Sequence, residues 1–334
     1  MLTGNANEAN ARIPVTDRSP ARATRVKPAT IACAAEPHQE ATWTLKLGVA
    51  ATILALTFGA ASLALARAND PERVTFLSKD GKTTLVGYVF KPDPLPATRV
   101  PAVVMMHGRA GAYSTNARNN YDASTLSKRH HMWGRLWAGA GYIAILVDGF
   151  GPRGYPRGFP RFSYSDRPAD VDEVGIRPLD AYGALVYLRT RPDVIGDRIA
   201  LHGWSNGASA TLSAMSTDAP GIQDPTPSTG FRAAIAFYPA CGLKDRFKDG
   251  YRSYAPVRVF HGSADEEVSA SKCRRFVQAS RSAGSDIAIR IYRDATHGFD
   301  DPGRRRQRIS ANAEAAEDAI GRATEFLRRS LKDE

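Results

Sequence analysis

The pentapeptide Gly203-Trp204-Ser205-Asn206-Gly207 is the most informative segment of this chain. The apolar residues 199–202 precede it and the small residues 208–215 follow it, so the local order is strand, sharp turn and helix. On such a turn a serine is held in a strained backbone conformation that exposes its hydroxyl, and the flanking glycines let strand and helix approach closely. The pattern predicts that Ser205 is a nucleophile at the end of a strand.

An acid and a histidine follow Ser205 in chain order. Asp265 lies in the turn after an apolar segment at 257–261, and His297 lies in the loop after another at 287–292. Neutral imidazole is well suited to take the serine proton near neutral pH, and a carboxylate on its other ring nitrogen holds the required tautomer. We therefore predict that Ser205, Asp265 and His297 act as nucleophile, acid and base.

Other residues remain open for the acid and the base. An aspartate in a turn after a strand is often a turn or helix-cap residue. The competing carboxylates and histidines are Glu266, Glu267, Asp294, His107 and His261. His297 is favoured because it lies on a loop after the last expected strand and is followed by Gly298.

The oxyanion that forms during attack on a carbonyl requires hydrogen-bond donors already in place. The backbone N–H of Asn206, directly after the nucleophile, is the first expected donor. The second is expected in the turn after the apolar segment 102–106, where we assign the backbone N–H of Arg109.

Apolar strands alternate with helical stretches after a hairpin at 74–77 and 84–89. The expected strands are 102–106, 142–147, 199–202, 233–238, 257–261 and 287–292. The expected helices are 124–140, 178–190, 206–215, 269–283 and 311–331. Alternation of this kind predicts an α/β fold with a mostly parallel central sheet and helices on both faces. In such folds the site lies at the carboxyl ends of the strands.

Taken together, several motifs resemble the dienelactone hydrolase family of α/β-hydrolases over roughly residues 73–332. They are Met106-His107-Gly108, Asp148-Gly149-Phe150-Gly151-Pro152-Arg153-Gly154, the Ser205 pentapeptide, Phe237-Tyr238-Pro239 and Ala295-Thr296-His297-Gly298-Phe299. The resemblance implies an α/β-hydrolase fold of about eight strands, a metal-free triad and action on esters or lactones. The enzymes that gave the family its name carry cysteine at the position of Ser205, so a more general ester hydrolase is at least as well supported. The alternatives are a serine peptidase or amidase and a non-catalytic binding protein of the same fold.

The N-terminal residues predict export. Residues 1–46 form a polar extension expected to be disordered, whereas 47–66 are uncharged, mostly apolar and long enough to span a bilayer. The small residues around Ala68 indicate a signal peptide at 47–68, cleaved to leave a periplasmic or secreted catalytic domain at 69–334. An uncleaved N-terminal membrane anchor is the alternative, and the long extension fits either the anchor's cytoplasmic tail or a mis-assigned start codon.

The stretch 149–172 interrupts the alternation and is rich in glycine, proline, arginine and aromatic residues. Because it follows a strand end, we expect it to lie over the site, and we assign Arg153 to an anionic group of the substrate. A purely solvated loop is the alternative. Trp204, next to the nucleophile, is assigned to the acyl pocket or otherwise to core packing.

The composition of the chain limits the classes of binding partner that we expect. The net charge of +11 is not concentrated on a helix with interleaved aromatics, so we expect a small-molecule ester or lactone as partner and no nucleic acid. Clustered His and Cys motifs are missing from the sequence, so no metal and no cofactor is assigned. Cys241 and Cys273 are able to pair in an exported protein, but their proximity is not readable from sequence.

Overall fold

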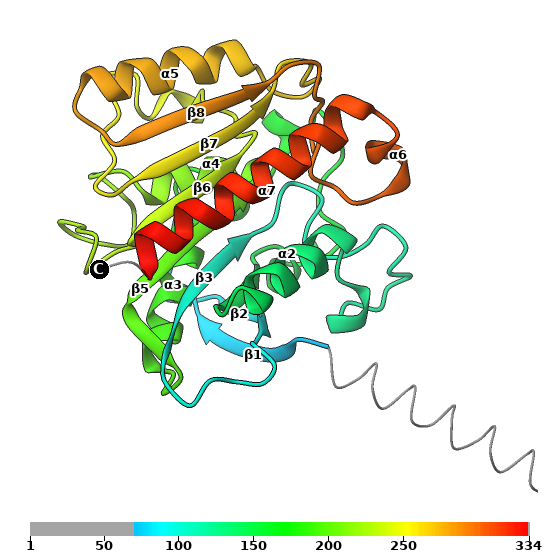
Figure 1. Ribbon diagram of the computed structural model, residues 1–334, viewed down its shortest axis with the longest axis vertical. Helices are drawn as coiled ribbons and strands as arrows, with labels where there is room; N and C mark the ends of the chain where they lie inside the picture. The colour runs from blue at the N-terminus through cyan, green and yellow to red at the C-terminus, as the bar shows by residue number, and fades with distance from the viewer. Residues whose placement is uncertain (1–69, 333–334) are drawn as a thin grey trace, which may run out of the picture. The chain divides into compact units, whose positions relative to one another are not determined.

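The computed structural model describes residues 70–332, which contain one eight-stranded sheet in the order β1-β2-β4-β3-β5-β6-β7-β8 (Figure 1). Strand β2 pairs antiparallel with both β1 and β4, and the remaining neighbours are parallel. The strands are β1 (Glu72–Leu77), β2 (Thr84–Phe90), β3 (Val100–Met106), β4 (Ile143–Asp148), β5 (Val194–Trp204), β6 (Ala233–Phe237), β7 (Val257–Gly262) and β8 (Ile287–Tyr292). The predicted α/β fold with a mostly parallel sheet is confirmed.

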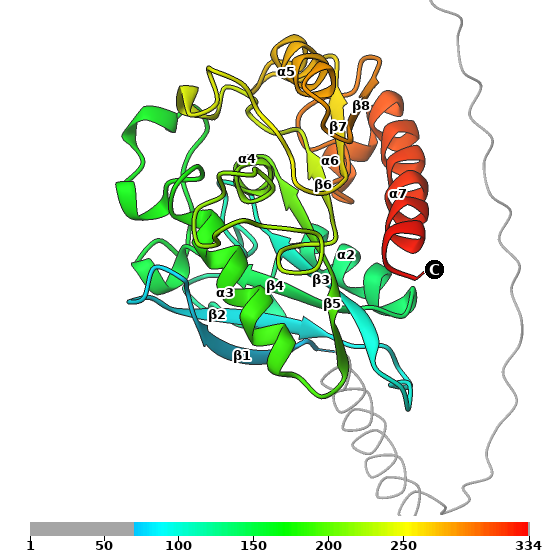
Figure 2. The same cartoon turned by 90° about the vertical axis from the view of Figure 1, so that its left-hand side faces the viewer.

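Helices cover both faces of the sheet (Figures 1 and 2). One face carries α2 (Lys128–Gly139) and α7 (Ser310–Leu331), and the other carries α3 (Arg177–Thr190), α4 (Asn206–Ala214) and α5 (Ala270–Ser282). Shorter helical segments are η1 (Ala123–Thr125), η2 (Gly151–Arg153), η3 (Tyr164–Asp166), η4 (Ala169–Val171), η5 (Leu243–Asp245) and α6 (Arg304–Gln307). The three arginines at 304–306 belong to α6.

Strand β3 shows how the sheet separates two apolar layers. Side chains alternate between the faces of a strand, so Val104 packs in the layer of α3 and α4, whereas Val103 packs in the layer of α2 and α7. Every residue of β3 is buried. A strand covered on both sides in this way reads as a continuous apolar run, which is why β3 was recognisable in the sequence.

Helix α2 begins later than the sequence pattern predicted. Asp122 caps the short η1 turn, and the helix starts only after Ser127, whose hydroxyl accepts a hydrogen bond from the N–H of His130. Capping by an acceptor side chain satisfies a free N–H of the first turn and marks the true start. The shift leaves residues 123–125 in the loop that borders the site.

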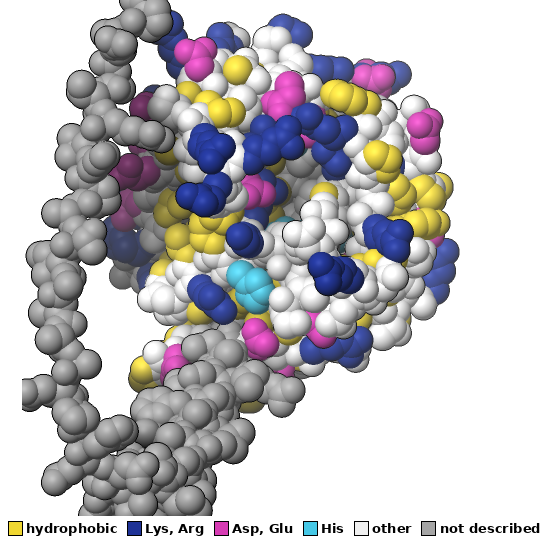
Figure 3. All heavy atoms as spheres, turned by 90° about the vertical axis from the view of Figure 1, so that its right-hand side faces the viewer, with side chains coloured by type: hydrophobic (Ala, Val, Ile, Leu, Met, Phe, Trp, Pro, Cys, Tyr) yellow, Lys and Arg dark blue, Asp and Glu magenta, His cyan; other side chains and the backbone are white. Residues whose placement is uncertain are grey.

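The proposed leader and its cleavage site lie outside the described residues. Within residues 70–332 no helix is long and apolar enough to cross a membrane. The face seen in Figure 3 carries Lys and Arg side chains interspersed with acidic, hydrophobic and neutral ones.

Candidate active site

Ser205 occupies a strained turn between β5 and α4. Its backbone has φ 52° and ψ −116°, in the region of φ that non-glycine residues seldom adopt. A Cβ atom at Gly203 would lie 2.3 Å from the carbonyl oxygen of Gly207, and one at Gly207 would lie 2.1 Å from the oxygen of Met106. Both positions therefore require glycine for the helix to start this close to the strands.

Three side chains form a hydrogen-bonded line across the carboxyl ends of β5, β7 and β8. The Nε2 atom of His297 lies 3.0 Å from the hydroxyl oxygen of Ser205, and its Nδ1 atom lies 2.8 Å from Oδ2 of Asp265. The other carboxylate oxygen of Asp265 accepts the backbone N–H groups of Glu267 and Val268. A base is thus placed on the serine and a carboxylate on the base, which is the geometry that serine activation requires.

The competing carboxylates occupy different positions. Glu266 accepts the backbone N–H of His297 at 2.9 Å and does not contact the Nδ1 side of the ring. Glu267 lies 3.9 Å from Nε2 and forms an ion pair with Arg109 at 2.8 Å. Asp294 is largely exposed and pairs with its neighbour in sequence. Of the four candidates, Asp265 holds the imidazole.

The competing histidines are buried away from Ser205. His107 accepts the backbone N–H of Gly149 through Nε2, and His261 lies 3.7 Å from Asp265. Burial lowers the pKa of both rings, so they remain neutral at physiological pH. Neither has a hydrogen bond to Ser205 among the described residues.

The turn after β3 passes beside the nucleophile, as expected for the second oxyanion donor. A Cβ atom at Gly108 would lie 3.4 Å from Cβ of Ser205. Arg109 follows, and its guanidinium is held by Glu267 and by the carbonyl oxygen of Phe159. The assigned N–H groups of Arg109 and Asn206 therefore belong to two segments that both lie next to the serine.

Arg153 does not face the site, so its assignment to a substrate anion is wrong. Its side chain is only 4% exposed and pairs with Asp80 at 2.9 Å and Asp180 at 2.8 Å. It also donates to the carbonyl oxygen of Gly149. Because its donors are engaged by two buried carboxylates, Arg153 joins the 149–172 loop to the hairpin turn and to α3.

The assignment of Trp204 to the acyl pocket is also wrong. Its side chain is fully buried in the α2 and α7 layer, and its indole N–H donates to Asp300 at 2.8 Å. Asp300 also accepts from Trp133 and Tyr238. Trp204 belongs to a buried aromatic network beneath the site, which is the packing alternative.

Two cavities meet at the nucleophile and share three lining residues, Arg109, Ser205 and Glu267. The larger, of about 490 Å³, extends from Asn206 towards Cys241 and Lys272, and we call it the α5-side cavity. The smaller, of about 330 Å³, extends past His297 towards α2, and we call it the His297-side cavity. The Arg109–Glu267 ion pair thus separates two spaces that both open onto Ser205.

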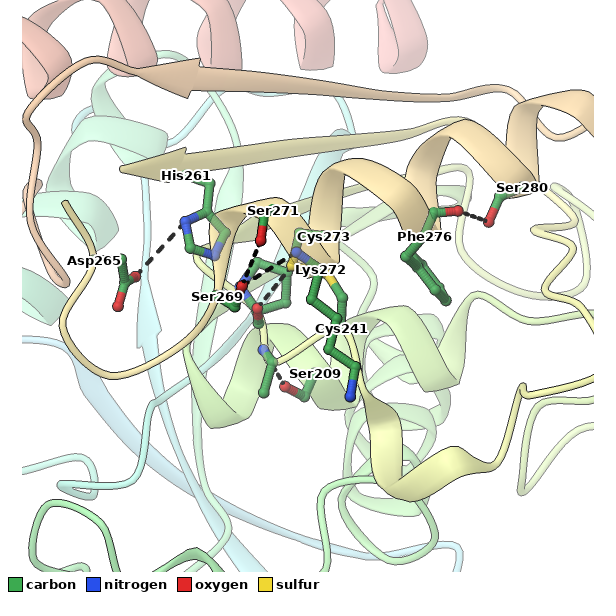
Figure 4. The surroundings of a disulfide bond; sticks show 12 residues. Ser209, Cys241, His261, Asp265, Ser269, Ser271, Lys272, Cys273, Phe276 and Ser280 are labelled. Carbon is green, nitrogen blue, oxygen red and sulfur yellow. Dashed lines mark hydrogen bonds and ion pairs between the residues drawn. A yellow bond between two sulfur atoms is a disulfide. The ribbon is translucent and has the colours of Figure 1, made fainter. Parts of the chain in front are cut away.

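A disulfide joins Cys241 to Cys273 (Figure 4). It connects the segment after β6 to the first turn of α5, with a Cα–Cα distance of 5.0 Å. Cys241 itself lines the cavity. The sequence left this pairing open because it depends on two segments separated by 32 residues.

Arg167 is a candidate binding residue that sequence reasoning did not single out. It lies in the 149–172 loop, lines the α5-side cavity and has one long hydrogen bond, 3.4 Å to Ser163. Within residues 70–332 it has no ion pair with a carboxylate. Burial lowers its pKa, and the charges of Glu173 and Glu267 oppose that effect only in part. Its guanidinium also lies 5.4 Å from the centre of the Tyr164 ring. Its position among four arginines in the loop was visible in the sequence, but the difference in its contacts was not.

The described residues include no group of three or more His, Cys, Asp or Glu side chains arranged to hold a metal ion.

The fold and the line of three side chains define the chain as an α/β-hydrolase. A model of the dienelactone hydrolase family matches residues 85–331, and the chain belongs to that family. The apo form of esterase 2 from Thermogutta terrifontis superposes with a TM-score of 0.56 at 23% identity, covering 77% of this chain and 94% of that one. The same esterase phosphorylated by paraoxon gives 0.53 at 21% identity, covering 78% and 94%.

The chain is also similar to one part of a much longer human protein. Dipeptidyl peptidase 8 from Homo sapiens is 28% identical over 259 residues, which cover 69% of this chain. The match spans about a quarter of that protein, 26% of its length.

Proposed function

We propose that the protein hydrolyses a small carboxylic ester or lactone through an acyl-enzyme on Ser205. The observation that carries the proposal is the hydrogen-bonded line of Ser205, His297 and Asp265, hereafter the proposed triad, with its serine on a strained turn. Membership of the dienelactone hydrolase family supports ester or lactone chemistry. The similarly folded protein from Thermogutta terrifontis is named an esterase, which agrees with the proposed ester hydrolysis.

Each step has a group in reach. His297 Nε2 takes the proton of Ser205 as the hydroxyl oxygen attacks the carbonyl carbon, and Asp265 stabilises the imidazolium that forms. The resulting oxyanion is held by the N–H groups of Asn206 and Arg109. As the carbonyl re-forms, the bond to the leaving oxygen breaks and that oxygen receives the proton from His297. Water, deprotonated by the same nitrogen, then releases the acid and restores the serine.

Each of the two cavities is suited to one part of the ester. The leaving oxygen must receive its proton from Nε2, so the alcohol part occupies the cavity that His297 lines. The acyl part then occupies the α5-side cavity, whose wall includes Phe162, Tyr164 and Arg167. This arrangement fits a small acyl group with an apolar body and an acidic end.

The experiment is hydrolysis of p-nitrophenyl esters of increasing acyl length by residues 69–334, with Asp265→Asn and Glu266→Gln compared. Asp265→Asn should lower kcat on the order of 10² to 10⁴-fold because the imidazole loses its required tautomer. Glu266 meets His297 only at its backbone N–H and otherwise pairs with Arg161 and Arg306, so Glu266→Gln should cost less than about tenfold. An inactive wild type, or a greater loss in Glu266→Gln, would contradict the proposal.

A peptidase or amidase activity is the second candidate, supported by the similarity to dipeptidyl peptidase 8. The same triad chemistry releases an amine when His297 protonates the leaving nitrogen. Esters, enol lactones and aminoacyl amides of matched acyl groups separate the candidates. We expect kcat/KM to be larger for the ester than for the amide.

We further propose that the catalytic domain works outside the cytoplasm, on the basis of residues 47–68, which lie outside the described part of the chain. Expression in a host with a Sec pathway should yield periplasmic protein with a new N-terminus near Asn69. N-terminal sequencing decides between this and retention in the membrane by an uncleaved anchor. Full-length soluble protein in the cytoplasm would contradict both.

A further inference from the structure

A buried arginine outside the proposed triad connects the two segments that carry the proposed oxyanion donors. Arg177 begins α3 and is fully buried. A single nitrogen, Nη1, donates to the carbonyl oxygen of His107 at 2.7 Å and to Oδ1 of Asn206 at 2.5 Å. His107 lies in the turn that leads to Arg109, and Asn206 directly follows the nucleophile. One guanidinium therefore spans the gap between the two donor segments.

The amide of Asn206 is held at its other end as well. Its nitrogen donates to Oε2 of Glu173 at 3.0 Å, and Glu173 is 2% exposed. Asn206 is thus fixed between a buried cation and a buried anion, and hydrogen bonds to charged groups are stronger than neutral ones. Burying both charges is costly, so ordinary packing would favour apolar residues here.

The guanidinium packs against an aromatic ring, and Nη1 is its hydrogen-bonding atom, since Nε and Nη2 are buried without a hydrogen-bond partner among the described residues. The ring of Phe150 lies 4.8 Å from the guanidinium, and the same ring packs edge-on against His107 at 4.5 Å. Burial lowers the pKa of Arg177 to about 10, with the nearby Asp180 and Glu173 opposing that effect, so the side chain stays charged at neutral pH. His107 is therefore held twice. Its carbonyl oxygen accepts a hydrogen bond from Arg177, and its ring packs against Phe150.

We propose that Arg177 is a positioning residue for the oxyanion hole, an inference that rests on the proposed ester hydrolysis. Donors stabilise the oxyanion only when they are held at hydrogen-bond distance from where its charge develops. By binding His107 and Asn206 through one nitrogen, Arg177 sets the separation of the two N–H groups. It does not touch the substrate, and its effect is on the transition state and not on ester binding.

The test compares Arg177→Met with Arg153→Met, a matched control. Arg153 is also buried and paired, but it contacts neither His107 nor Asn206. Arg177→Met should lower kcat roughly 10- to 100-fold with KM changed less than about threefold, since part of the oxyanion stabilisation is lost. A boronic acid, which forms a tetrahedral adduct on the serine, should bind more weakly by a similar factor. Arg153→Met should leave both quantities within about threefold of wild type.

A second variant distinguishes a catalytic defect from a folding defect. Removing Arg177 leaves the carboxylate of Glu173 buried beside it, so Arg177→Met is also made together with Glu173→Gln, and thermal melting by circular dichroism is recorded. The double variant should fold and keep the kcat deficit. A folded variant with kcat within about threefold of wild type, or an equal loss in Arg153→Met, would overturn the inference. A wild type that neither cleaves esters nor reacts with a fluorophosphonate would instead overturn the proposed function.

Discussion

The proposed triad and the 149–172 loop both lie at the carboxyl ends of parallel strands, yet different forces hold them. Ser205, Asp265 and His297 stand on the turns after β5, β7 and β8, so the sheet brings them together. The loop after β4 has no strand partner, and each of its arginines is held by its own set of side-chain and backbone groups. Sheet topology therefore positions the first region, and individual side-chain contacts position the second.

The arginines of the loop show how different those pairings are. Arg153 is buried between two aspartates, Arg161 reaches Glu266 and Glu267 and is 40% exposed, and Arg157 contacts Asn119. Arg167 lines the α5-side cavity and, within residues 70–332, forms no ion pair with a carboxylate. Similar residues in one loop can therefore be told apart only once their partners are known.

The largest expected effect is at the strand ends. Ser205→Ala should lower kcat roughly 10³-fold or more, because the triad members act as one unit, and should leave thermal unfolding unchanged. The exposed serine at the start of α5, Ser271, provides the control, and Ser271→Ala should be fully active. Mass spectrometry after fluorophosphonate treatment should find the label on Ser205. A label on another serine would show that Ser205 is not the nucleophile.

Breaking the loop's buried ion pair should cost stability and spare catalysis. Arg153→Met leaves Asp80 and Asp180 unpaired, for which we expect a loss of about 3 kcal/mol in the free energy of unfolding. Arg161→Met, a half-exposed arginine of the same loop, should lose less than about 1 kcal/mol. Urea unfolding of the two variants measures the difference. The reverse order would show that burial does not distinguish the loop's arginines.

Arg167 should decide charge preference within the loop. An ester whose acyl group ends in a carboxylate should have a higher kcat/KM than its neutral analogue, by about 1.5 to 3 kcal/mol in transition-state free energy. Arg167→Gln should remove the preference and spare the neutral ester. Equal kcat/KM values for the matched pair in the wild type would leave Arg167 without this role.

The smallest expected effect is the pH dependence of the stability that Glu267 provides. Glu267 binds Arg109, in the turn beside the proposed triad, and Arg161, in the 149–172 loop. Burial opposes ionisation of Glu267, but hydrogen bonds from Arg109 and Arg161 and the charge that His297 carries when protonated lower its pKa to about 2 from an ordinary 4.5. A lowered pKa in the folded state means that the stabilisation is complete above pH 4.5 and is lost as the pH falls towards 2.

Comparison of wild type with Glu267→Gln by urea unfolding measures that contribution. The wild type should be more stable by about 1 to 2 kcal/mol at pH 6, after allowance for solvent screening. The difference should shrink at pH 3. A difference that stayed constant with pH would assign the effect to packing and not to charge.

Much of the fold was predictable because its signals are local. Apolar runs and turns located the strands, and the glycines around Ser205 indicated a close approach, which the structure shows because a Cβ atom added at Gly207 would lie only 2.1 Å from the carbonyl oxygen of Met106. The order Ser205, Asp265, His297 was visible for the same reason, and the structure brings the three together. The roles assigned to Arg153 and Trp204 failed because sequence adjacency to the site does not tell which way a side chain points.

Local sequence signals predicted the α/β fold, the order of its elements and the turns that carry the candidate nucleophile, acid and base, because periodicity, glycine and turn chemistry act over a few residues. Which buried charged and polar groups meet became known from the three-dimensional structure alone. Arg153 meets Asp80 across 73 residues, and Arg177 meets His107 across 70. The cost of burying a charge depends on the groups that surround it in space, and those groups come from distant parts of the chain.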